Sequence, residues 1–119
     1  MGLMSAEDCI FCRIATKKMD VPLMHEDDLS VAFNDINPQS PTHCLVIPKR
    51  HVATLADAEE GDERLLGHLM TVAKKIAAKE GLQKNGYRVV VNTGPNAGQT
   101  VFHLHVHLLG GRSFSWPPG

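Results

Sequence analysis

Apolar and polar residues follow patterns that predict one long helix and five short strands. From Asp62 to Glu80, apolar residues recur at three- and four-residue spacing, and Gly81 follows as a C-terminal cap. A short N-terminal helix is expected over residues 9–16. Period-two or compact apolar runs predict strands over residues 23–26, 29–34, 42–47, 87–92 and 101–109. These elements predict an α+β fold with a mostly antiparallel sheet and one main helix on a face.

The length of the chain predicts one domain. With 119 residues, 43% of them apolar, residues 1–119 are sufficient for a single core and too few for two. We expect residues 1–8 to be disordered and residues 110–119 to form a C-terminal arm, which holds the only tryptophan.

Charge and hydropathy exclude several classes of partner. The 12 basic and 13 acidic residues give a net charge of -1, which offers no general attraction to nucleic acid or to an anionic membrane surface. The longest apolar runs have four residues, far below the roughly 18 that a membrane-spanning helix needs. The N-terminus shows no secretory signal, and three cysteines are a poor disulfide framework. We therefore expect a cytoplasmic protein.

Three of the seven histidines form a row at alternate positions, His103, His105 and His107. On a strand they share one face, while the residues between them face the core. A single zinc ion is a poor explanation for all three, because His103 and His107 would lie roughly 13 Å apart at about 3.3 Å per residue. Imidazole serves as nucleophile, proton donor or orienting group near neutral pH, so the row favours nucleophilic chemistry.

Two nearby segments carry polar groups whose role the sequence leaves open. Gly98 allows close backbone approach, and Gln99 and Thr100 can donate hydrogen bonds to phosphate oxygens, although a plain turn fits this segment as well. Asp35 begins a loop with two prolines, where it can pair with ribose hydroxyls or simply end the preceding strand.

Residues 103–109 match the motif His-φ-His-φ-His-φ-φ, with φ apolar, at every position. The chain therefore resembles the histidine triad (HIT) superfamily and is expected to have a HIT-like fold. Further matching segments span nearly the whole chain, at residues 35–43, 45–51, 65–70, 98–103 and 108–112. The ending Trp116-Pro117-Pro118-Gly119 is similar to the histidine triad nucleotide-binding branch, the purine nucleoside phosphoramidases.

The resemblance implies a homodimer with one continuous sheet that hydrolyses the phosphorus–nitrogen bond of adenosine 5′-monophosphoramidates. His105 would attack phosphorus to form a nucleotidyl-histidine intermediate. His107 would contact the phosphate and leaving group, His43 would support the nucleophile, and His103 would border the site. No cofactor is required for this reaction. We expect a backbone carbonyl to hold the second nitrogen of His105, since no acid has obvious access to it.

The same resemblance implies a set of nucleotide contacts. Asp35 matches the acid that binds the ribose, and the positions beside the phosphate are Asn92, Gln99 and Thr100. The apolar base pocket consists of Phe11, Phe33 and Ile36. Three further contacts are Val101, His105 and His107.

Cys9 and Cys12 form a Cys-x-x-Cys pair that resembles the pair of zinc-carrying HIT proteins. In those proteins the pair is joined by two histidines, which match His51 and His103. A Cys₂His₂ set suits structural zinc. The alternative is that both cysteines are small buried residues on a helical turn.

Other function classes remain open at this stage. An AMP-binding adaptor with weak catalysis, a zinc-stabilised interaction domain, and a dinucleotide hydrolase or nucleotidyl transferase each fit part of the pattern. The intact histidine row favours an enzyme, and the compact length with the Trp-Pro-Pro-Gly ending favours the phosphoramidase.

Overall fold

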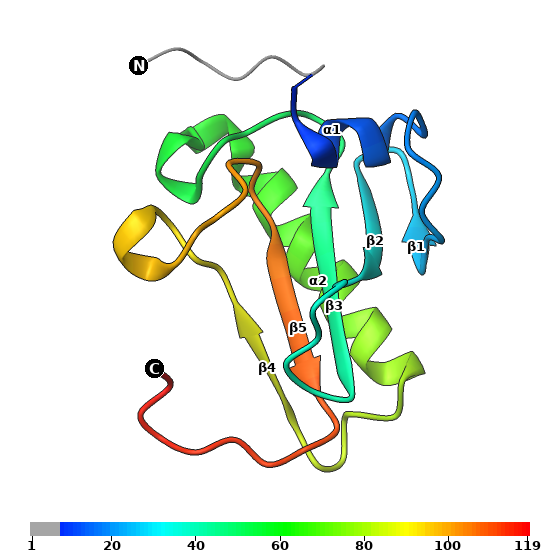
Figure 1. Ribbon diagram of the computed structural model, residues 1–119, viewed down its shortest axis with the longest axis vertical. Coiled ribbons are helices and arrows are strands. Elements are labelled where there is room, and N and C mark those ends of the chain that lie inside the picture. Colours follow the sequence, from blue (N-terminus) through cyan, green and yellow to red (C-terminus); the bar gives the residue numbers. More distant parts are fainter. Residues whose placement is uncertain (1–7) are drawn as a thin grey trace.

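The computed structural model describes residues 8–119, which form a five-stranded antiparallel sheet with one long helix on a face (Figure 1). The strand order is β1-β2-β3-β5-β4, and every neighbouring pair is antiparallel. The strands are β1 (His25–Glu26), β2 (Ser30–Asn34), β3 (Thr42–Pro48), β4 (Tyr87–Val90) and β5 (Val106–Gly110). The helices are α1 (Ile10–Ala15) and α2 (Glu63–Lys79), with 3-10 turns η1 (Leu55–Asp57), η2 (Glu60–Asp62) and η3 (Pro95–Ala97). The predicted α+β fold is confirmed. None of the helices in residues 8–119 is long and apolar enough to cross a membrane.

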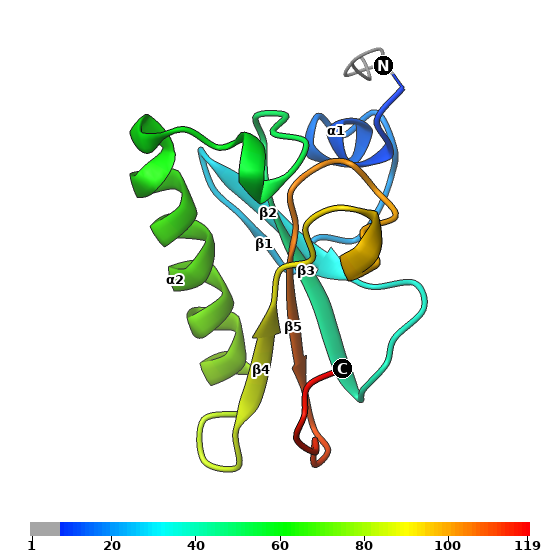
Figure 2. The ribbon, with the colours of Figure 1, turned by 90° about the vertical axis from the view of Figure 1, so that its left-hand side faces the viewer.

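Alternating side chains on β2 and β3 build two cores, one on each face of the sheet. Ala32 and Val46 pack under α2, whose buried stripe is Leu69, Val72, Ala73, Ile76 and Ala77. Val31 and Ile47 point the other way and pack with α1. Figure 2 shows α2 along one face and α1 at the other side of the sheet. The second, smaller core is the one on which the candidate site is built.

The strand predicted over residues 101–109 begins only at Val106, so the prediction was wrong for residues 101–105. In the observed register Val46 faces Val106, and continuing the ladder would place Pro48 opposite Leu104. Pro48 has no N–H to donate. Its carbonyl instead accepts from Nε2 of His103 at 2.8 Å, so the chain before Val106 leaves the ladder.

The predicted division into two faces nevertheless holds across this irregular segment. Leu104, Val106 and Leu108 are buried in the core under α2. His103 and His105 lie on the opposite face, where both rings contact Phe11 edge-on. The apolar alternation therefore sets the direction of the side chains even where the hydrogen-bond ladder has ended.

The C-terminal arm follows β5 and runs beside β4. Arg88 of β4 donates to the carbonyl of Ser115, and its guanidinium lies 5.2 Å from the centre of the Phe114 ring. Trp116 is 82% exposed. At the other terminus, the expected disorder of residues 1–8 falls outside the described residues apart from Asp8.

Asp27 fastens the turn between β1 and β2 to helix α2. Its Oδ1 accepts from the backbone N–H groups of Leu29 and Ser30, both at 2.8 Å. Its Oδ2 accepts from Nε2 of His25 at 2.6 Å and from Nε2 of His68 at 2.8 Å. Burial alone would raise the pKa of Asp27, but these hydrogen bonds outweigh it and hold the pKa well below its ordinary value.

We expect Asp27→Asn to lower the free energy of unfolding by about 1–3 kcal/mol at pH 6, because hydrogen bonds to a charged group are lost. A depressed folded-state pKa contributes stability above the unfolded pKa of about 3.9, and this contribution is lost as the pH falls through the folded value. The difference between wild type and variant in urea unfolding should therefore shrink from pH 5 towards pH 2. Asp28→Asn, at an exposed neighbour, is the control and should change little. A difference that is the same at every pH would contradict this account.

Candidate functional site

His105 is held with one ring nitrogen free to act as a nucleophile. Its Nδ1–H donates to the backbone carbonyl of His103 at 2.7 Å, which leaves the lone pair on Nε2. Burial lowers the pKa of His105, so the ring is neutral near pH 7. The expectation of a backbone carbonyl as the partner of this ring is confirmed.

A directed chain of hydrogen bonds fixes the proton position on the other two rings. The backbone N–H of Gln39 donates to Nδ1 of His43 at 3.0 Å, so the proton of the neutral His43 ring is on Nε2. That Nε2–H lies 2.9 Å from Nδ1 of His107 and donates to it. The proton of His107 is therefore on Nε2, a buried nitrogen without a hydrogen-bond partner among residues 8–119.

His107 is a neutral donor in this arrangement. Burial is the largest cause that lowers its pKa to about 4, followed by the neighbouring His105 and His43 rings. Because an unpartnered buried donor costs free energy, Nε2–H of His107 is a candidate contact for a bound ligand. His43 thus supports His107 directly and the nucleophile only through it.

Two of the three predicted base-pocket residues pack behind the nucleophile. The Phe11 ring meets His105 edge-on, with 5.1 Å between ring centres at 89°. Phe33 contacts Phe11 at 5.5 Å, and both are buried. Ile36 differs from them because it is 100% exposed in the loop after β2. Phe11 therefore supports the His105 ring, whereas Ile36 is open to a ligand.

The side chain of Gln99, one of the residues expected beside the phosphate, is hydrogen-bonded within the protein. Its Oε1 accepts from the N–H of Gly94, and its Nε2 donates to the carbonyls of Ala53 at 2.9 Å and Val101 at 3.1 Å. Both amide hydrogens are engaged, so this buried side chain holds its loop and has no donor free for phosphate. Thr100 is exposed, whereas Val101 and Asn92 are partly buried.

Asp35 makes a turn contact, which is one of the two roles that the sequence left open. Its Oδ1 accepts from the N–H of Asn37 at 2.8 Å, which forms a turn directly after β2. Its Oδ2 lies 3.4 Å from Nε2 of His43. The carboxylate therefore sits beside the relay, with acceptor capacity left on Oδ2.

The first histidine of the row belongs to a different cluster, together with the cysteine pair. Nδ1 of His103 lies 3.3 Å from Sγ of Cys9 and 3.4 Å from Sγ of Cys12. Nδ1 of His51 lies 3.2 Å from Sγ of Cys12 and 3.2 Å from Nδ1 of His103. Tetrahedral zinc, with bonds of about 2.3 Å to sulfur and about 2.0–2.1 Å to nitrogen, places its ligand atoms roughly 3.3–3.8 Å apart. The four donors are spaced to fit zinc.

Protonation at the second ring nitrogen of His103 also suits a metal. Its Nε2–H donates to the carbonyl of Pro48, which leaves a lone pair on Nδ1 facing the cluster. Burial lowers the pKa of His103 to about 4, and burial together with Cys9 raises the pKa of Cys12 to about 11. The predicted ligands Cys9, Cys12, His51 and His103 are thus brought together; His51 is partly buried and the other three are buried.

A second cluster, Asp35, His43 and His107, also brings possible ligand atoms within 4.8 Å of one another. Hydrogen-bond direction argues against a metal there. Nδ1 of His43 accepts from Gln39, and its Nε2–H donates to His107, so neither nitrogen has a lone pair to offer. We therefore interpret this cluster as a proton relay.

The structure adds Gln39 to the site. It acts through its backbone N–H, which every residue except proline carries, so the side-chain type gives no signal in the sequence. The Pro-bounded loop containing Gln39 can be recognised in the sequence, but the contact between Gln39 and His43 is known only from the structure.

Comparison with known proteins shows the family of this chain. Residues 16–114 match the HIT domain family. The chain belongs to that family. An uncharacterised HIT-like protein of Synechococcus elongatus is 54% identical over 114 residues, which cover 96% of this chain and 99% of the relative.

Two solved structures are similar to this HIT domain. The crystal structure of a HIT family hydrolase from Legionella pneumophila has a TM-score of 0.91 and 49% identity, over 93% of this chain and 99% of the other. A zinc-bound histidine triad family protein from Mycobacterium smegmatis has a TM-score of 0.79 and 33% identity, over 91% of this chain and 78% of the other.

We expect this HIT domain, purified without chelator, to contain about one zinc ion per chain by elemental analysis. Cys12→Ser should remove the zinc and lower Tm by at least about 5 °C, because metal binding adds to folding free energy. Cys44→Ser is the matched control, since Cys44 is a free, buried cysteine in the core under α2 and should leave the zinc content unchanged. A wild type that holds no zinc would show that the cluster is only a packed set of side chains.

Proposed function

We propose that this HIT domain hydrolyses the phosphorus–nitrogen bond of adenosine 5′-monophosphoramidates through a nucleotidyl-histidine intermediate on His105. The observation that carries the proposal is the hydrogen bond from Nδ1 of His105 to the His103 carbonyl, which presents Nε2 as a neutral lone pair. The similarity to a HIT family hydrolase supports hydrolytic chemistry.

The reaction proceeds in two displacements. In the first, Nε2 of His105 forms a bond to the α-phosphorus as the phosphorus–nitrogen bond of the substrate breaks, and the amine leaves with the electron pair and takes up a proton. In the second, water bonds to phosphorus, the bond to His105 breaks, and water releases a proton. One water is consumed, and the products are AMP and the free amine.

The relay supplies the hydrogen bond that this reaction needs. We assign Nε2–H of His107 to the phosphate and the leaving nitrogen, where it stabilises the developing charge. Asp35 would accept from a ribose hydroxyl through Oδ2, and exposed Thr100 would donate to phosphate. Ile36 would cover the purine base.

The metal ligands are separate from the reacting atoms in this proposal. When bound, zinc would supply a structural cross-link between the α1 segment, His51 and His103, and we assign no catalytic cofactor. Cys9, Cys12 and Cys44 form no disulfide within residues 8–119, which suits the reducing cytoplasm to which we assign the protein.

The nucleophile is tested by His105→Ala with a fluorogenic adenosine phosphoramidate. We expect turnover to fall by at least about 10³-fold, because the covalent route is lost. Rapid-quench mass spectrometry should find an AMP adduct on wild type and none on the variant. The control is AMP binding to the variant by calorimetry, which shows that its site is intact. Wild type that binds AMP without turnover would favour the adaptor instead.

We also propose that two copies of the chain join along β4 to form one continuous sheet. β4 is an edge of the sheet, and at four residues it is the longer of the two edges. An edge strand offers unpaired N–H and C=O groups to a second copy. Val89 on this strand is apolar and 36% exposed.

Val89→Lys should convert a dimer to monomer, because a charge replaces an apolar contact at the pairing edge. Sedimentation velocity measures the oligomeric state of wild type and variant directly. Leu29→Lys, at an exposed apolar residue between β1 and β2, is the control and should remain dimeric. A dimer that persists in the Val89 variant would place the interface elsewhere.

A further inference from the structure

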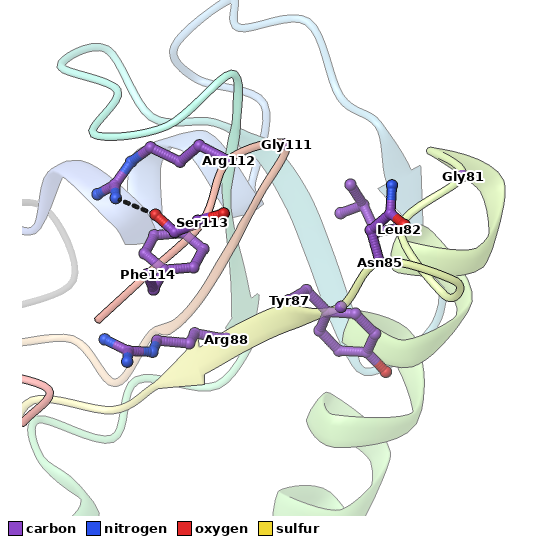
Figure 3. A pocket seen from close by; sticks show the side chains of 10 residues that line it. Gly81, Leu82, Asn85, Tyr87, Arg88, Gly111, Arg112, Ser113 and Phe114 are labelled. Carbon is purple, nitrogen blue, oxygen red and sulfur yellow. Dashed lines mark hydrogen bonds between the residues drawn. The ribbon is translucent and has the colours of Figure 1, made fainter. Parts of the chain in front are cut away.

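The C-terminal arm carries an arginine that is not part of an ion pair within residues 8–119. The Arg112 guanidinium lies 4.2 Å from the centre of the Phe114 ring, and Arg88 lies against the same ring. Figure 3 shows Phe114 between the two arginines. Both arginines line a cavity of about 730 Å³ between β4 and the arm, and this cavity includes none of the predicted site residues.

Arg112 is tied to the loop between β2 and β3. Its Nε–H donates to the carbonyl of Gln39 at 3.0 Å. The preceding Gly111 has φ of +91°, and a Cβ added there would lie only 2.9 Å from Cβ of Pro41. Two successive residues of the arm therefore meet the same loop closely.

This contact reaches the proton relay through one residue. The carbonyl of Gln39 accepts from Arg112, while the N–H of Gln39 donates to Nδ1 of His43. The Gln39 side chain bonds only within its own loop, to the carbonyl of Asn37. Within residues 8–119, Arg112 is thus the residue outside this loop that donates a hydrogen bond to the Gln39 backbone and restrains it.

We propose that Arg112 is a positioning residue that sets which nitrogen of His43 and of His107 carries the proton. It keeps the Gln39 N–H against Nδ1 of His43, and the direction of every later hydrogen bond in the relay follows from that contact. The catalytic consequence rests on the proposed function, whereas the proton positions do not.

Loss of the tie would reverse the relay. Without the Gln39 N–H, the His43 ring can carry its proton on Nδ1 and accept at Nε2. His107 would then donate from Nδ1, and its Nε2 would present a lone pair to the substrate in place of a donor. Strongly basic amines, which leave least readily, would suffer most from the loss of that donor.

The test compares Arg112→Ala with Arg88→Ala, since both remove one guanidinium from the same aromatic ring but only Arg112 contacts Gln39. For an alkyl-amine phosphoramidate we expect kcat of Arg112→Ala to fall by about 10- to 100-fold, the cost of a misplaced catalytic group. The loss should be smaller for an aryl-amine substrate. Arg88→Ala should stay within about twofold of wild type for both. Equal losses in the two variants would overturn the proposal.

A second measurement does not require turnover. Long-range ¹H–¹⁵N NMR of the histidine rings identifies the protonated nitrogen, which should be Nε2 on His43 and His107 in wild type and in Arg88→Ala. In Arg112→Ala we expect the proton of His43 to move to Nδ1 in a measurable share of molecules. Unchanged proton positions would overturn the positioning role. A wild type with the expected protons but no turnover would instead contradict the proposed function alone.

Discussion

The site depends on the position of one residue, His103. Its ring nitrogen Nδ1 faces two thiols and a second imidazole, its Nε2–H is held by the end of β3, and its backbone carbonyl holds the nucleophile. These three contacts use three different groups of one residue, so none can be satisfied without fixing the others. The position of the Cys₂His₂ cluster and the position of the His105 ring therefore depend on each other through His103.

Backbone groups, rather than carboxylates, orient the reactive histidines. Carbonyls fix the rings of His103 and His105, and an N–H fixes the ring of His43. A carboxylate partner would favour the charged imidazolium, whereas an uncharged partner in a buried site leaves the ring neutral. A neutral imidazole can offer its lone pair to phosphorus, so an uncharged hydrogen-bond partner suits a nucleophile better than a carboxylate would.

Much of this arrangement could be predicted from the sequence because it depends on period. The alternation from His103 to Leu108 correctly separated core from chemistry, and the spacing in α2 located its buried face. The end of the ladder was missed, since it depends on which residue stands opposite Pro48 in the fold, and that residue, Leu104, is 56 positions away in the chain.

Contacts formed by the backbone were the other feature that the sequence did not predict. Gln39 contributes its N–H and carbonyl, and neither is encoded by its side chain. Residue type alone predicts that the amide of Gln99 can donate to phosphate, yet in the fold both of its hydrogens are donated to carbonyls of two separate segments. Residue type indicates which chemistry is available, but only the fold determines which of those groups is already used.

The single tryptophan has a consequence for how the protein can be observed. Trp116 is on the arm and 82% exposed, while the two cores contain no tryptophan among their residues. The fluorescence emission of Trp116 therefore reports the polarity around the arm and changes little when either core unfolds. Intrinsic fluorescence is thus an optical probe for whatever covers the C-terminal end of the chain, and unfolding has to be followed by circular dichroism instead.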